Sequence, residues 1–248
     1  MARRQRSPTP SLSRPVKCLI ASVAFAALAC PAQAQPFAYV TNSGSANVSV
    51  IETAGNAVVA TVPVAERPIG VAVSPDGTRT YVANSDSNTV SVLATSSNSV
   101  IDTIAVQSFP QGLAVTADGS RVFVANTASN SVSVIATGTD TVLATVGVGI
   151  GPAGVAITPD GSHAYVTNSG SGSVSVIDTV TDTVDATIPV GENPLTVALT
   201  PDGSRAYVTN SSETLGSVFV VDTATNIVTA TRLVPPSTPA WNELRPAA

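Results

Sequence analysis

Side chains with reactive or metal-binding groups are scarce in this 248-residue chain. It has two cysteines, Cys18 and Cys30, one histidine, His163, and one lysine, Lys17. The chain beyond residue 34 therefore contains no thiol, which excludes a disulfide framework, a thiolate nucleophile and a cysteine-based metal site there. A catalytic or metal-binding role for His163 would need partner residues, and there is no second histidine. We expect no catalytic residue, no metal site and no cofactor.

Aromatic and charged residues are also few, at 4% and 11% of the chain. Hydrophobic residues make up 44%, and most of them are Val, Ala and Ile, which are typical of packed strands. Few segments show the spacing of an amphipathic helix. The composition predicts an all-β protein.

Five of the 11 basic residues lie before residue 34, whereas all 16 acidic residues lie after it. Beyond residue 34 there are six Arg, no Lys and 16 acidic residues, a formal charge of −10. Such a body repels phosphate backbones and anionic lipid surfaces. We therefore expect no nucleic-acid partner and no binding to an anionic membrane.

The first 34 residues have the layout of a secretory signal peptide. Residues 1–17 are basic, residues 18–29 form an apolar run, and small residues occupy positions 32 and 34. The run is too short to span a bilayer, which needs about 20 residues. We predict cleavage after Ala34 and export to the periplasm or cell surface. The alternative is a lipoprotein with Cys30 as its lipidated N-terminus.

Internal repeats dominate the rest of the chain. An aromatic residue recurs every 42 positions and opens a segment of the type Y-V-T-N. The five positions are Tyr39, Tyr81, Phe123, Tyr165 and Tyr207. A turn motif of the type S/T-P/A-D-G precedes the last four of them, at 74–77, 116–119, 158–161 and 200–203. Pro, Asp and Gly favour the central positions of a tight turn.

Each period predicts four short strands, which in the second repeat cover 70–74, 80–84, 89–94 and 99–104. Hairpin turns would join them into one antiparallel sheet, and a period of about 40–45 residues per sheet is typical of a β-propeller. A β-solenoid is the structural alternative, although its coils are shorter. Small residues such as Gly70 and Gly112 are expected to relieve crowding where innermost strands converge.

These motifs resemble the YVTN-type β-propeller repeats of surface-layer-like and other secreted proteins. The resemblance covers about residues 37–234 and implies a fold rather than an activity. Members of that family usually close a ring of about seven blades. Here we predict five repeats, the first with three strands and the others with four, which leaves ring closure in doubt. Open edges would permit self-association. Residues 235–248 form a Pro-rich tail.

Binding is expected where the repeats differ, in the loops that follow the second and fourth strands. These loops emerge on one face, here called the loop face, whereas the other turns form the turn face. Loops on a rigid scaffold commonly carry binding residues. The candidates are Glu66, Arg67, Phe109, Glu192, Asn193 and Glu213. We predict a non-catalytic scaffold that binds a protein or glycan of the cell envelope. A structural component of a surface layer, and an enzyme of lactonase or dehydrogenase-subunit type, remain alternatives.

The invariant polar residues are interpreted as structural. An asparagine ends the second strand of every repeat, where its side chain could bond the loop backbone. These residues are Asn42, Asn84, Asn126, Asn168 and Asn210. The aspartates of the tight turns, Asp76, Asp118, Asp160 and Asp202, are expected to form the turns. Calcium bound by loop 84–88 is the alternative use of such oxygen atoms.

Overall fold

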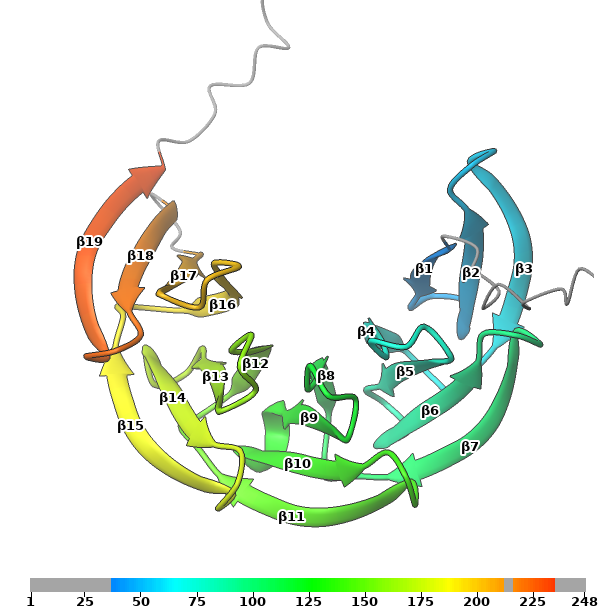
Figure 1. Ribbon diagram of the computed structural model, residues 1–248, viewed down its shortest axis with the longest axis horizontal. Helices are drawn as coiled ribbons and strands as arrows, with labels where there is room; N and C mark the ends of the chain where they lie inside the picture. The colour runs from blue at the N-terminus through cyan, green and yellow to red at the C-terminus, as the bar shows by residue number, and fades with distance from the viewer. Residues whose placement is uncertain (1–36, 212–215, 235–248) are drawn as a thin grey trace, which may run out of the picture. The chain divides into compact units, whose positions relative to one another are not determined.

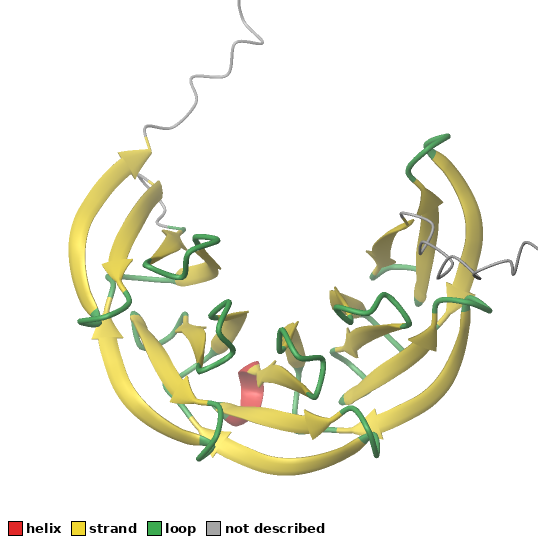
Figure 2. Ribbon diagram, viewed as in Figure 1, coloured by secondary structure: helices red, strands yellow, loops and turns green. Residues whose placement is uncertain are grey.

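The computed structural model describes residues 37–211 and 216–234, which form five antiparallel sheets, here called blades 1 to 5 (Figure 1). Blade 1 has three strands and the others have four, so the all-β propeller-like fold and the predicted 19 strands are confirmed in these residues. A single turn of 3-10 helix, η1 (Thr127–Ser129), interrupts the strands (Figure 2). The predicted signal peptide and the Pro-rich tail lie outside the described residues.

The strand bounds follow the 42-residue period closely. Blade 1 contains β1 (Phe37–Asn42), β2 (Asn47–Glu52) and β3 (Ala57–Pro63). Blade 2 contains β4 (Pro68–Val73), β5 (Arg79–Asn84), β6 (Thr89–Ala94) and β7 (Ser99–Ala105). Blade 3 contains β8 (Pro110–Val115), β9 (Arg121–Asn126), β10 (Ser131–Ala136) and β11 (Thr141–Gly147). Blade 4 contains β12 (Pro152–Ile157), β13 (His163–Asn168), β14 (Ser173–Asp178) and β15 (Thr183–Pro189). Blade 5 contains β16 (Pro194–Leu199), β17 (Arg205–Asn210), β18 (Gly216–Asp222) and β19 (Ile227–Val234).

Neighbouring blades pack face to face. The innermost strands β4, β8, β12 and β16 contact one another in that order, and β1 contacts β4. Each hydrophobic cluster combines side chains of two successive blades; the cluster between blades 2 and 3 includes Tyr81, Val92, Val122 and Ile135. Because both faces of an inner blade are covered, its middle strands are apolar or small on both sides. Blades 1 and 5 do not close on each other (Figure 1).

Glycine sets the spacing of the innermost strands, as the sequence predicts. A Cβ atom on Gly70 would lie 2.1 Å from the carbonyl oxygen of Gln111 in the next blade. The same construction at Gly112 and Gly154 gives 2.2 Å to Ala153 O and 2.7 Å to Leu195 O. Blade 5 carries Thr196 at this position. A further innermost strand packed against β16 in the same way would collide with the Thr196 side chain.

The two outer faces are more exposed than the joints between blades. Val40 in β1 is 44% exposed, whereas its counterpart Val82 is fully buried. Tyr207 in β17 is 37% exposed, whereas its counterpart Tyr165 is buried. Self-association stays a prediction, and since Thr196 obstructs the inner edge of blade 5, the face of blade 1 around Val40 is the better surface for it.

Candidate functional site

The loop face is built around one backbone position that adopts a left-handed conformation in four blades. This position precedes the proline that opens the innermost strand. Its residues and φ angles are Arg67 (53°), Phe109 (59°), Gly151 (66°) and Asn193 (51°). Glycine and asparagine enter this region readily, whereas arginine and phenylalanine do so at a cost of about 1–2 kcal/mol. The loop face thus holds two large side chains in a strained conformation.

Arg67 and Phe109 contact each other across the joint between blades 2 and 3. The Arg67 guanidinium carbon lies 5.0 Å from the centroid of the Phe109 ring, within the range of a cation–π interaction. Arg67 Nη1 also lies 3.4 Å from Asp86 Oδ1, in a solvent-exposed ion pair. On the other side of Arg67 is a shallow depression of about 420 Å³ lined by Ser43, Gly44, Ala46, Glu66, Arg67 and Asp86.

Hydrogen bonds from the neighbouring loop fix this backbone. The Phe109 N–H donates to Asn88 Oδ1 at 2.8 Å, and the Glu66 N–H donates to Ser87 Oγ at 2.8 Å. Asn88 is itself left-handed, with φ of 56°. Asp86 and Asn88 were not among the predicted binding residues. The sequence does hint at Asn88, because its counterparts in blades 3 and 4 are Asn130 and Gly172. All three residues have a positive φ.

The predicted binding residues do not form one cluster. Glu66, Arg67 and Phe109 lie together with Asp86. Glu192 and Asn193 make their contacts within blade 5, where Asn193 Nδ2 donates to Ser211 O at 2.9 Å and Glu192 O accepts from Asn210 Nδ2 at 2.9 Å. Glu213 lies outside the described residues.

The five asparagines that end the second strands of the repeats, here called the asparagine ladder, are structural. Most of them do not form the loop-backbone bonds that the sequence predicts. In blades 1 to 4 the asparagine amide donates to a serine hydroxyl seven residues further on, across the adjacent strand. The pairs are Asn42–Ser49 (2.9 Å), Asn84–Ser91 (2.9 Å), Asn126–Ser133 (3.0 Å) and Asn168–Ser175 (3.0 Å). Among the described residues, the asparagine amide bonds loop backbone in blade 5 alone, at Val190 O and Glu192 O. In blades 1 to 4 these asparagine side chains therefore join neighbouring strands.

The aspartates of the turn face form the tight turns, as predicted. Asp118 accepts from the backbone N–H of Ser120 at 3.0 Å and from the Ser120 hydroxyl at 2.8 Å. Hydrogen bonds from Thr116 and Ser120 lower the pKa of Asp118 to about 2. Equivalent bonds lower the pKa of Asp160 and of Asp202 to about 2. These carboxylates are occupied within their own turns.

The free energy of unfolding is expected to decrease as the pH falls from about 4 to about 2. The folded pKa of these aspartates, about 2, lies below the ordinary value of 3.8. Their contribution is thus complete above pH 3.8 and is lost as the pH falls through 2. Denaturation midpoints in urea at pH 5, 3.5 and 2.5 measure this. A variant with Asp118→Asn, Asp160→Asn and Asp202→Asn should lose much of this dependence of stability on pH. An equal pH dependence in wild type and variant would show that these three aspartates do not cause it.

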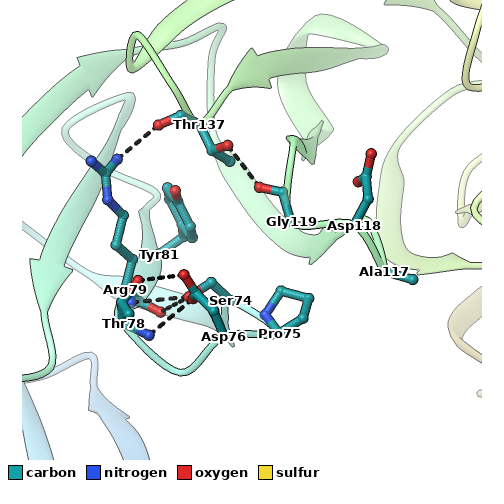
Figure 3. Close-up of a pocket in the computed structure, with 10 residues that line it drawn as sticks. All are labelled: Ser74, Pro75, Asp76, Thr78, Arg79, Tyr81, Ala117, Asp118, Gly119 and Thr137. Atoms are coloured by element: carbon teal, nitrogen blue, oxygen red, sulfur yellow. Dashed lines mark hydrogen bonds between the residues drawn. The ribbon is translucent and has the colours of Figure 1, made fainter. Parts of the chain in front are cut away.

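The turn face also has a groove between blades 2 and 3, of about 510 Å³ (Figure 3). Arg79 crosses this joint, and its Nη1 donates to Thr137 O at 2.8 Å and to the Asp140 carboxylate at 2.9 Å. Tyr81 lies beside Arg79, and burial raises the pKa of its phenol while Arg79 opposes the rise. The ten residues that line the groove include no His, Cys or Lys. Arg79 connects the two blades, whereas Asp76 and Asp118 bond within their own turns.

Stacked four-stranded sheets with these turns and loops define a propeller-type repeat protein. The model of the YNCE-like beta-propeller family matches residues 106–244, more than half of the sequence. The chain belongs to this family. A second family model, described as lactonase, 7-bladed beta-propeller, matches residues 31–148. The narrower likeness to YVTN-type repeats remains a resemblance.

Solved structures show the same fold. Hydrazine synthase of Kuenenia stuttgartiensis is similar over 68% of this chain and 49% of its own, with 30% sequence identity and a TM-score of 0.66. A functionally unknown protein from Desulfotomaculum acetoxidans is similar over 79% of this chain and 64% of its own, with 20% identity and a TM-score of 0.66. This chain thus spans less than two thirds of either. No curated protein matches it.

Helices capable of crossing a membrane are not found in the described residues.

Proposed function

We propose that this protein is a non-catalytic binding scaffold, exported to the periplasm or cell surface, whose loop face binds a protein or glycan partner of the cell envelope. The observation that carries the proposal is the pair Arg67 and Phe109. Both occupy left-handed backbone positions that Gly151 and Asn193 fill in other blades. Strained residues of this kind concentrate at functional sites, because the fold alone does not favour them.

The chemistry of the pair suits recognition. Arginine and aromatic side chains are enriched among residues that dominate binding energy. The Phe109 ring is half-buried and rigid, while Arg67 and Glu66 are exposed beside the 420 Å³ depression. An aromatic plane with charged groups of both signs next to it can take a sugar ring or the side chains of a partner protein.

Substitution of both residues by asparagine tests the proposal. Asparagine tolerates the left-handed conformation, so relief of strain offsets the lost cation–π contact, and we expect the free energy of unfolding to change by less than about 1 kcal/mol. Capture of envelope partners by the tag-immobilised protein should fall by at least about tenfold, the size of one strong binding residue.

Arg205→Asn is the matched control, because Arg205 is an exposed arginine of the turn face. This variant should capture the same partners as the wild type. Capture by the Arg67→Asn/Phe109→Asn protein at wild-type level would show that the loop face is not the binding surface.

The match to the lactonase family model favours a second candidate, lactone hydrolysis. The described residues contain one histidine, His163, as a potential general base. Turnover of a lactone that depended on His163 would support this candidate over a non-catalytic scaffold.

A further inference from the structure

Two of the four joints between the described blades have an equivalent Arg–Asp ion pair, and two lack it. Arg79 of blade 2 binds Asp140 of blade 3 at 2.9 Å, and Arg121 of blade 3 binds Asp182 of blade 4 at 3.0 Å. At the joint between blades 4 and 5, His163 and Asn226 occupy the same two positions. Tyr165 donates to Asn226 Oδ1 there at 2.8 Å, so Asn226 is paired without His163. The His163 imidazole therefore does not bond to the next blade as Arg79 and Arg121 do.

Two carboxylates lie near His163 in the same blade, and one of them, Asp185, departs from the repeat. The position of Asp178 is Ala94 in blade 2 and Ala136 in blade 3. Blades 1 and 5 also carry an acid at that position, but neither has a histidine to accompany it. The position of Asp185 is apolar or neutral in every other blade: Val59, Ile101, Leu143 and Thr229. Among the described repeats only blade 4 combines an imidazole with two carboxylates.

The side chains of His163, Asp178 and Asp185 converge in space although 22 residues separate the first from the last. His163 in β13 pairs with Asp178 at the end of β14. A bulge between β14 and β15 then shifts the register, so that Asp185 turns toward the same side. His163 Nε2 lies 3.6 Å from Asp185 Oδ2, and one ligand atom from each residue lies within 4.8 Å of the others.

Residues outside the cluster orient two of the three groups. Ser162 Oγ lies 2.8 Å from Asp160 Oδ1 and 2.8 Å from His163 Nδ1. Since the serine donates its proton to the aspartate, it accepts from Nδ1–H, which leaves the Nε2 lone pair facing the carboxylates. A carboxylate that orients a metal-binding histidine through its second nitrogen is a usual feature of metal sites. Asp178 Oδ1 accepts from the N–H groups of Val180 and Thr181, at 2.8 and 2.7 Å, which fixes that carboxylate.

We propose that His163, Asp178 and Asp185 bind a divalent transition-metal ion. One imidazole nitrogen and two carboxylate oxygens suit Zn²⁺ or Mn²⁺. Water would complete the coordination, because Asp185 is exposed and the other two residues are half-buried. His163 also lines a groove of about 340 Å³ between blades 4 and 5.

Variants that copy the other blades test the proposal with little risk to the fold. His163→Arg restores the residue of blades 2 and 3, and Asp185→Leu restores that of blade 3. The tag-free full-length protein is dialysed against Zn²⁺, Mn²⁺ or Ca²⁺ in turn, and bound metal is measured by mass spectrometry. We expect about one equivalent of Zn²⁺ or Mn²⁺ in the wild type. Each variant should weaken binding by at least about tenfold, as even the loss of an orienting residue does.

Asp222→Ala is the matched control, because Asp222 is the counterpart of Asp178 in blade 5. It should bind metal like the wild type. Ser162→Ala should weaken binding about 10–100-fold without removing a ligand. Equal metal content in the wild type and His163→Arg, or wild-type binding of Ca²⁺ alone, would overturn the proposal. None of these results depends on the loop face, so failure here leaves the proposed function standing.

Discussion

Gly112→Ala is expected to lower the free energy of unfolding by about 3 kcal/mol, the upper range for an overpacked core. The added Cβ would lie 2.2 Å from the carbonyl oxygen of Ala153 and 3.1 Å from Gly154 Cα. Both atoms belong to the backbone of β12 and cannot rotate away. The joint between blades 3 and 4 must therefore widen, which separates the apolar faces that fill it. Denaturant titration followed by circular dichroism measures the change.

Gly138→Ala is the matched control for this experiment. Gly138 lies in the turn between β10 and β11, and a Cβ there meets no atom within 4 Å. Its substitution should leave stability unchanged or raise it slightly, since alanine restricts the unfolded chain. Equal effects at Gly112 and Gly138 would show that the innermost strands are not in close contact.

The second large effect is expected at the ion pair of the joint between blades 2 and 3. Asp140→Asn should lower the free energy of unfolding by about 1.5 kcal/mol, the lower range for a charged hydrogen bond. The Asp140 side chain is 14% exposed and that of Arg79 is 33% exposed, so solvent weakens the pair only in part. Asparagine keeps the left-handed φ of 52° that Asp140 adopts. The substitution thus removes the charge without straining the turn.

A double-mutant cycle with Arg79→Gln isolates the pair. We expect a coupling of about 1 kcal/mol that decreases at high salt. The cycle His163→Gln with Asn226→Ala, at the corresponding positions of blades 4 and 5, should show no coupling, because these two side chains do not bond each other. A coupling at blades 4 and 5 as large as that at blades 2 and 3 would contradict the account of the joints.

The fold could be predicted because its signals are local. In the last four repeats the tight-turn motif lies a few residues before the aromatic residue, and the sheet follows from their period. The closeness of the innermost strands was also predictable, since Gly70 and Gly112 recur where bulk is excluded. The open arrangement of the blades agrees with the strand count.

The sites were harder to predict because they depend on register. The asparagine ladder bonds serines across the adjacent strand, which a loop-based interpretation missed. His163 has carboxylate partners after all: Asp178 faces it through strand pairing, and Asp185 reaches it through a bulge. Simple alternation along a strand gives the wrong face after a bulge. Likewise, the contact of Arg67 with Phe109 joins residues one full repeat apart, and nothing in either repeat signals it alone.

Site-specific photo-crosslinking in the native envelope tests the loop face most directly. The chain beyond residue 34 has no lysine, so a photoreactive residue is introduced at Glu66 on the loop face or at Val180, which is 80% exposed on the turn face. The account predicts a discrete crosslinked partner from position 66 and none from position 180. Crosslinking from position 180 alone would contradict it and place recognition on the opposite face.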